Sequence, residues 1–147
     1  MKILVLTPTF LPVVGGAELV LWEVYRRLSA KHSILLLTPE LQETLIETYA
    51  RDKEEYPVNF KVVRYKDRLT FMAIPGHRFT HGFVPPFSIS AIFALKKVLE
   101  GFKADVINVH YTMPTGLAGA IANTFWKVPT VLTLNGRDVP GPGVPFF

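Results

Sequence analysis

Short apolar runs alternate along this chain with segments whose apolar residues recur at helical spacing. The runs span residues 2–7, 33–38, 59–65, 104–109 and 129–134, and a further short strand fits residues 69–74. Runs that stay apolar, rather than alternating with polar residues, are typical of strands buried on both faces. We therefore expect a mainly parallel sheet built from the five longer runs.

Helices are expected between these strands, over residues 17–31, 41–51, 88–100 and 114–127. In the first helix the apolar residues form one stripe, made of Ala17, Val20, Leu21, Val24 and Leu28. Ser88 and Gly101 are placed to cap and to stop the third helix, and the small residues of the fourth favour close packing on a sheet. The alternation predicts a doubly wound, Rossmann-like α/β fold with strand order about 3-2-1-4-5 and helices on both faces.

Composition narrows the class of protein. Hydrophobic residues make up 49% of the chain, enough for a core, and there is no cysteine for disulfides or thiolate metal sites. The net charge is +4. Its basic residues are scattered: Arg26, Arg27, Lys31, Lys61, Arg64, Lys66, Arg68, Lys96 and Lys97. We expect a cytoplasmic protein with no nucleic-acid partner, whose charge would allow peripheral contact with the inner face of a membrane.

The pair Gly15-Gly16 lies between the first strand and the first helix. Glycine lets a ligand approach the backbone closely, and free N–H groups at a helix N-terminus favour phosphate. The spacing matches neither the dinucleotide fingerprint nor the P-loop. Two interpretations stay open: an anion site, and a tight turn that needs glycine for its geometry. Glu18, in the first helical turn, is expected either to cap the helix or to contact a ligand.

Polar residues follow the fourth and fifth strands, and parallel strands bring such residues to one edge of a sheet. They are His110 and Tyr111 after the fourth strand, and Asn135, Arg137 and Asp138 after the fifth. In open α/β sheets ligands bind at this edge. The four-residue spacing of His77 and His81 could suit zinc on a helix, but they lie in a Gly- and Pro-rich loop without an evident third ligand. We therefore do not expect a metal site there: the loop is either simply mobile or in contact with a ligand.

Three segments of the sequence, taken together, are similar to those of a known protein family. Pro8-Thr9-Phe10 through Gly15-Gly16-Ala17-Glu18, then residues 104–110, then residues 129–138 occur in this order along nearly the whole chain. Together they resemble the N-terminal domain of the family-four retaining glycosyltransferases of the GT-B fold. The resemblance implies transfer of a sugar from a nucleotide-sugar to a sugar or lipid-linked acceptor, with retention and without a metal or other cofactor.

The resemblance also implies roles for single residues. Gly15 and Gly16 would bind the donor diphosphate, and His110 would act at the transferred sugar as the catalytic residue. The acceptor and the cleft would be contacted by Phe10, Glu18, Tyr111, Asn135, Arg137 and Asp138. The family often has histidine where this chain has Asn135, which puts an imidazole role there in doubt. The apolar loop at residues 10–14 would suit an acceptor with a lipid portion.

The resemblance further implies a C-terminal domain that holds most of the nucleotide-sugar. We expect residues 1–147 to be the acceptor-side domain, truncated and inactive without its partner domain. Strand 130–134 would then be an exposed edge that invites a homodimer. A different class remains open: a free-standing nucleotide or phosphate-ligand binding module of doubly wound fold, without catalysis.

Overall fold

A computed structural model describes residues 1–13, 15–40, 56–66, 70–71 and 87–135. The expected helix at 41–51 and the histidine loop lie outside these residues. The main sheet has five strands in the order β3 (Phe60–Tyr65), β2 (Ser33–Pro39), β1 (Lys2–Leu6), β6 (Val106–His110) and β7 (Thr130–Thr133). Each neighbouring pair is parallel. The predicted fold class and strand order are thus confirmed.

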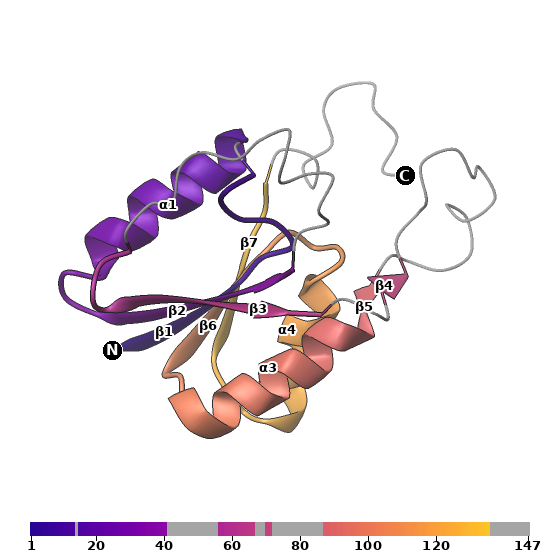
Figure 1. Ribbon diagram of the computed structural model, residues 1–147. Helices are drawn as coiled ribbons and strands as arrows, with labels where there is room; N and C mark the ends of the chain where they lie inside the picture. Colours follow the sequence, from indigo (N-terminus) through magenta and orange to yellow (C-terminus); the bar gives the residue numbers. More distant parts are fainter. Residues whose placement is uncertain (14, 41–55, 67–69, 72–86, 136–147) are drawn as a thin grey trace.

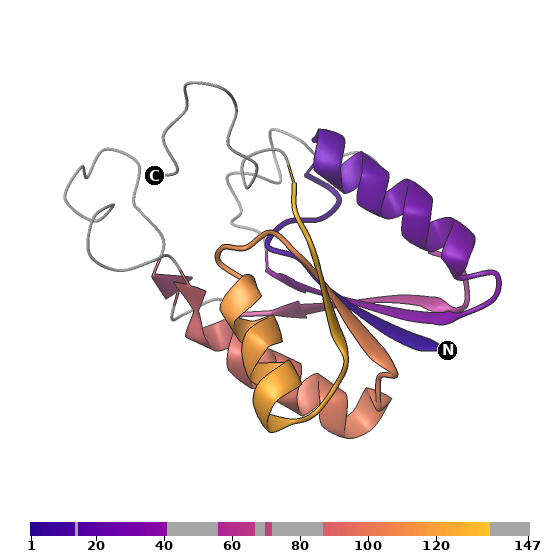
Figure 2. The ribbon, with the colours of Figure 1, turned by 180° about the vertical axis from the view of Figure 1, so that it is seen from behind.

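Helices cover both faces of this sheet, as predicted. Helix α1 (Gly16–Leu28) lies on one face, whereas α3 (Ile89–Phe102) and α4 (Gly116–Phe125) lie on the other (Figures 1 and 2). Alternate strand residues therefore enter two separate cores. Leu4, Leu6, Leu35, Leu37, Ile107 and Val109 pack against α3 and α4, and Val5, Ile34, Leu36 and Phe60 pack on the α1 side.

The apolar stripe predicted for α1 is partly wrong. Leu21 and Tyr25 are buried against the sheet, whereas Val20 and Val24 are 61% and 45% exposed. The face that packs therefore runs through Leu21 and Tyr25, four residues apart on one side of the helix. A tyrosine buries most of its ring as an apolar body and keeps one polar atom for a partner.

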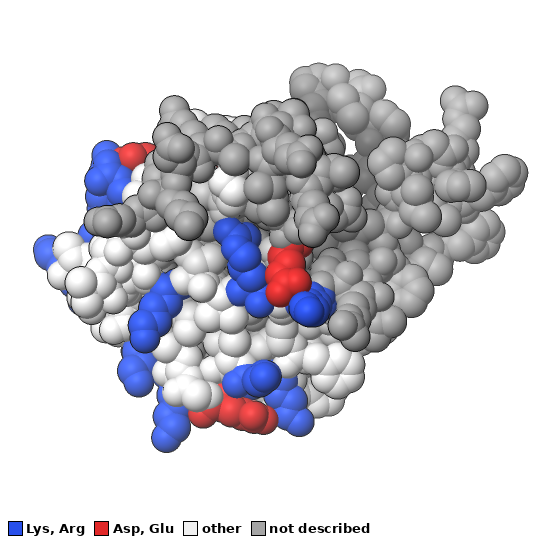
Figure 3. All heavy atoms as spheres, viewed as in Figure 1, with Lys and Arg blue, Asp and Glu red and all other residues white. Residues whose placement is uncertain are grey.

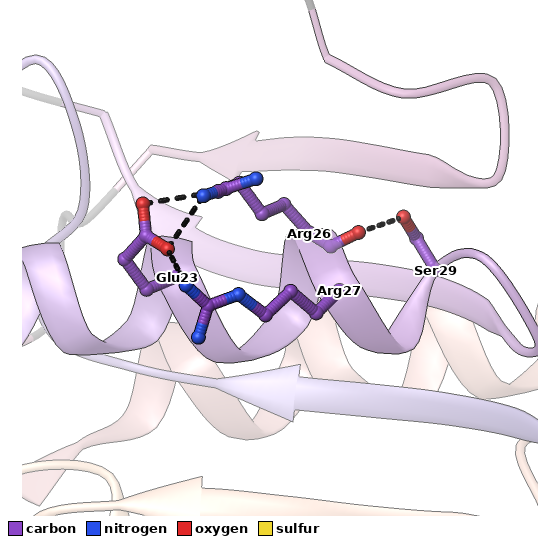
Figure 4. A network of polar contacts seen from close by, with 4 residues as sticks. All are labelled: Glu23, Arg26, Arg27 and Ser29. Carbon is purple, nitrogen blue, oxygen red and sulfur yellow. Dashed lines mark hydrogen bonds and ion pairs between the residues drawn. The ribbon is translucent and has the colours of Figure 1, made fainter.

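The outer face of α1 carries an ion-pair network near its end (Figure 4). Glu23 lies 2.6 Å from Arg26 Nη2 and 2.8 Å from Arg27 Nη2, and the hydrogen bond from Arg26 is the main cause that lowers the pKa of Glu23. Ser29 Oγ donates to the carbonyl of Arg26 at 2.7 Å. The helix ends at Leu28, three residues before its expected end. Figure 3 shows basic side chains scattered over the face of the molecule that is seen in Figure 1.

Helix α3 begins as predicted and ends differently. The Ser88 hydroxyl accepts a hydrogen bond from the Ala91 N–H at 3.0 Å, which confirms the predicted cap. Gly101 does not stop the helix, because it lies in the last turn. The helix is closed instead by Lys103, at φ 50°, whose N–H bonds to the Leu99 carbonyl. At the start of this helix, β5 (Phe87–Ser88) pairs antiparallel with β4 (Thr70–Phe71), the described part of the short strand expected at 69–74.

Glycine allows α4 to pack closely on the sheet. A Cβ atom at Gly119 would lie 2.5 Å from Cγ2 of Val109 and 3.3 Å from Cγ2 of Thr130. The predicted packing role of the small residues in this helix is therefore confirmed at Gly119. Close packing here fixes α4 against β6, the strand that ends in His110.

Candidate functional site

The topology places the first and fourth predicted strands side by side. From β1 the chain goes to β2 on one side, and from β6 it goes to β7 on the other. The carboxyl ends of β1 and β6 therefore meet at the point where the strand order reverses, the usual ligand site of an open α/β sheet. The segment after β1 leads to the N-terminus of α1, and β6 ends in His110.

The two glycines at the start of α1 differ in their surroundings. Gly15 is the N-cap residue in an extended conformation, so it needs no left-handed backbone. A Cβ atom there would collide with the carboxylate of Glu18, whereas a Cβ atom at Gly16 would meet nothing within 4 Å. The first N–H groups of a helix have no partner within the helix. Among the described residues, nothing lies close to the position that a side chain at Gly16 would take.

Glu18 is buried beside this helix end. Its carboxylate accepts a hydrogen bond from the Thr9 hydroxyl and lies against Gly15. A carboxylate at the third helical position, close to the N-cap, complements the positive end of the helix dipole. The bond that the structure gives Glu18 is to the Thr9 side chain and not to a backbone N–H, so capping stays a prediction. Contact with a ligand stays a prediction.

His110 is held by a chain of hydrogen bonds across three elements. Its Nε2 lies 2.9 Å from the Tyr25 hydroxyl, which also accepts from Asn108 Nδ2 at 2.7 Å. Thr133 Oγ1 donates to Asn108 Oδ1 at 2.9 Å. On the other side of the ring, Asn135 Nδ2 lies 3.5 Å from Nδ1. The structure therefore brings together two predicted site residues, His110 and Asn135.

Burial keeps His110 and Tyr25, the two ring side chains of this hydrogen-bond network, uncharged at neutral pH. Desolvation lowers the pKa of His110 to about 4, against a smaller raising effect of the hydrogen bond with Asn135. Desolvation likewise raises the pKa of Tyr25 to about 12, against the lowering effect of Asn108. A neutral imidazole has one donor and one acceptor nitrogen. Because Nε2 is engaged by Tyr25, a ligand can bond the ring only through Nδ1, in place of its 3.5 Å contact with Asn135, and the ring brings no positive charge to the site.

A sharp turn follows His110. Tyr111 adopts a left-handed backbone with φ 70°, an uncommon conformation for a residue with a side chain. Its N–H donates to the Thr133 carbonyl at 3.1 Å, and the Thr115 hydroxyl donates to the His110 carbonyl at 2.6 Å. The turn thus fixes the end of β6 and places Tyr111 directly beside β7.

Phe10 lies apart from this edge. Its side chain is fully buried and stacks on Phe60 with ring centroids 6.1 Å apart, beside Trp22 and Tyr56. The next residue, Leu11, is buried in the same core. Core burial accounts for the apolar character of these two residues, and acceptor contact by Phe10 stays a prediction. Arg137 and Asp138 lie outside the described residues.

The sequence analysis did not identify two residues of this hydrogen-bond network, Tyr25 and Asn108. Tyr25 lies four residues after Leu21 on the packed face of α1, and Asn108 is a polar residue inside an apolar strand. A polar group that interrupts a buried strand needs a partner, which is the signal that could have identified Asn108. Its partner Tyr25 comes from a helix 83 residues away in the chain.

Metal-binding and membrane-spanning features were also sought among the described residues. That part of the chain contains no group of three or more His, Cys, Asp or Glu residues that could hold a metal ion. His77 and His81 lie outside it. The helices that the structure describes include none with the length and apolarity to span a membrane.

Comparison with known proteins gives one match. The model of a protein family described as Glycosyltransferase Family 4 matches residues 14–146, which include the glycine pair, the whole sheet beyond β1 and the His110 turn. No curated protein matched the chain.

Proposed function

The chain belongs to glycosyltransferase family 4, and we propose that it is the acceptor-side domain of a sugar-transferring enzyme. The donor is a nucleotide-sugar and the acceptor a sugar or a lipid-linked molecule. Transfer proceeds with retention of the anomeric configuration, and no metal ion or organic cofactor takes part. A C-terminal domain that holds most of the donor completes the enzyme.

One observation carries this proposal: the buried histidine His110 ends β6 at the point where the strand order reverses, and the segment after β1 leads from the same edge of the sheet to the N-terminus of α1. Gly16 has free space in front of it, and His110 is fixed from α1 and β7. Preorganised N–H groups stabilise the negative charge that develops on a leaving diphosphate. In the proposal Gly15 and Gly16 supply these groups.

His110 acts at the transferred sugar in this proposal. The bond from the sugar C1 to the diphosphate oxygen breaks, and its electron pair leaves with the diphosphate. The acceptor oxygen forms the new bond to C1 on the same face, and its proton passes to the departing diphosphate. The neutral imidazole is suited to orient a sugar hydroxyl, because its low pKa prevents it from serving as a cationic acid at neutral pH.

In this proposal the acceptor is contacted by Tyr111 and Asn135, next to His110, and by Arg137 and Asp138, which follow in the chain. Glu18 and Phe10 complete the proposed acceptor set. Among the described strands β7 is the outermost on its side of the sheet, and Val131, Leu132 and, just after it, Leu134 are exposed. Such an edge pairs readily with another strand, so we include a second copy of the chain among its partners. A membrane that carries the lipid-linked acceptor is the other proposed contact.

The test is sugar transfer by the product of the complete reading frame that contains this chain. A panel of nucleotide-sugars is offered with sugar and lipid-linked acceptors, and NMR of the product reports the anomeric configuration. Transfer with retention by this product, and none by residues 1–147, supports the proposal. Nucleotide binding without turnover in both would replace it with the binding-module alternative.

A further inference from the structure

Asn108 is a polar residue in the otherwise apolar strand β6, and its side-chain amide is held at both ends. Its Oδ1 accepts a hydrogen bond from Thr133 Oγ1 at 2.9 Å, and its Nδ2 donates to the Tyr25 hydroxyl at 2.7 Å. An amide accepts through its oxygen and donates through its nitrogen. The structure thus turns the donor end of Asn108 toward the phenol of Tyr25.

The buried Tyr25 hydroxyl has one proton to give. Among the described residues it makes two hydrogen bonds, one with Asn108 and one with His110 Nε2 at 2.9 Å. Its oxygen already accepts from Asn108, so its proton goes to His110. If Nε2 were also a donor, the phenolic proton would be left without a partner, which is costly for a buried group. Nε2 is therefore the acceptor nitrogen of the ring.

The proton of the His110 ring then lies on the other nitrogen, Nδ1. A neutral imidazole carries one N–H, and burial, which lowers the pKa of His110 to about 4, keeps the ring neutral at pH 7. On the Nδ1 side Asn135 Nδ2 lies 3.5 Å away, at the long limit for a hydrogen bond. The 2.9 Å bond with Tyr25 is the shorter of the two and therefore decides which nitrogen is protonated.

From these directed hydrogen bonds we propose that Tyr25 and Asn108 are positioning residues that keep the proton of His110 on Nδ1. His110 then presents an N–H donor, and not a lone pair, to the oxygen of a bound ligand. The inference rests on the proposed function only for the identity of that ligand, the transferred sugar, whose hydroxyl oxygen accepts the bond. Because Nδ1 already carries a proton and Nε2 is engaged, His110 holds the sugar and is not a general base.

The first experiment determines the tautomer of His110 in the 147-residue chain without any ligand. Long-range ¹H–¹⁵N NMR at pH 7 distinguishes a protonated ring nitrogen from an unprotonated one. The chain has four histidines, and the signals that disappear in His110→Gln identify this ring. We expect the proton of His110 on Nδ1. A proton on Nε2 in the parent chain would overturn the proposal.

Asn108→Asp should reverse the direction of these hydrogen bonds. An ionised carboxylate keeps the shape of the amide but only accepts hydrogen bonds. The Tyr25 hydroxyl would then donate to the carboxylate and accept from His110, so the ring proton should move to Nε2. Tyr25→Phe removes the donor to Nε2, and its ring should no longer hold the Nδ1–H form alone. An unchanged Nδ1–H form in either folded variant would overturn the proposal, so each variant is sufficient if the other does not fold.

Tyr56→Phe is the matched control. It also removes one phenol hydroxyl, from a ring that packs against Trp22 of α1 and stacks on Phe60, away from His110. The His110 ring signals should equal those of the parent chain. A tautomer change as large as that of Tyr25→Phe would mean that any loosening of α1 moves the proton, and the proposal would be wrong.

The second experiment separates this inference from the proposed function. In the complete enzyme Tyr25→Phe should lower kcat about tenfold and leave the KM for the acceptor unchanged, because a directed donor at the transferred sugar is lost. If the tautomer responds as expected but the complete enzyme transfers no sugar, the proposed function fails and the tautomer assignment remains. If transfer occurs and Tyr25→Phe leaves kcat unchanged, this inference fails and the function remains.

Discussion

The hydroxyl of Tyr25 and Nε2 of His110 are joined at 2.9 Å across 85 residues of sequence. This contact ties the last turn of α1 to the end of β6. The orientation of the His110 ring therefore depends on a helix that is distant in the sequence. The first prediction concerns this pair.

Tyr25→Phe should destabilise the chain by about 1–3 kcal/mol, because His110 Nε2 and Asn108 Nδ2 would lose a buried partner while the packing of the ring is kept. Urea unfolding of the two proteins measures the difference. Tyr25 should also account for a phenol that titrates near pH 12, since burial raises its pKa to about 12. An ultraviolet titration that Tyr25→Phe leaves unchanged would contradict this assignment.

The stability of the chain should depend on His110 in acid. Burial lowers the pKa of His110 from 6.5 to about 4, so between these values the unfolded chain binds a proton that the native chain does not. The free energy of unfolding should therefore fall as the pH drops through this window, by up to about 1.4 kcal/mol per pH unit.

His110→Gln is the comparison that isolates this contribution, because the other histidines and the carboxylates titrate in both proteins. Denaturant unfolding at pH 4.5 and at pH 7 gives the slope for each. The variant should lose less stability than the parent over this range. Parallel curves would show that His110 titrates normally in the native chain.

Two glycines of α4 should respond oppositely to alanine. Gly119→Ala should cost about 1–3 kcal/mol, because its Cβ would lie 2.5 Å from Val109 Cγ2. Gly116→Ala is the matched control, since its nearest neighbour would be the Tyr111 carbonyl oxygen at an ordinary 3.5 Å. Alanine favours helix over glycine by up to about 1 kcal/mol, so this variant should be neutral or stabilised. Thermal unfolding ranks the two, and equal melting temperatures would contradict the packing described for α4.

Gly16→Ala tests the donor side without disturbing the fold. A Cβ atom there meets nothing within 4 Å, so the melting temperature should stay the same or rise slightly. The same atom would stand between a diphosphate and the helix N-terminus. We expect a KM for the nucleotide-sugar that is at least about tenfold higher in the complete enzyme, which corresponds to about 1.4 kcal/mol. An unchanged KM would remove Gly16 from the donor site.

The sheet could be predicted because its strands are apolar on both faces, a pattern that helices of this length do not share. The strand order was expected from the alternation of strands and helices, which is typical of doubly wound sheets. The rotation of α1 about its own axis could not be predicted, because Val20, Leu21 and Val24 are all apolar. Only the packed structure shows which of them faces the sheet. Helix termini were likewise set by local hydrogen bonds, as at Lys103, rather than by the nearest glycine.

The candidate site could be predicted in position but not in detail. His110 follows a buried strand, and its place at the ligand edge needs no further information. Its partner Tyr25 depends on a contact between elements distant in the chain.

The most direct test of this account is the rate of sugar transfer by the complete enzyme with His110→Ala. His32→Ala is the control, because that histidine lies beside the N-terminal amino group, away from the edge where β6 ends. We predict that kcat falls at least about a hundredfold in His110→Ala, a typical loss for a group that acts in the transition state, and stays unchanged in His32→Ala. A folded His110→Ala enzyme with the parent kcat would contradict the claim that sugar transfer takes place where β1 and β6 meet.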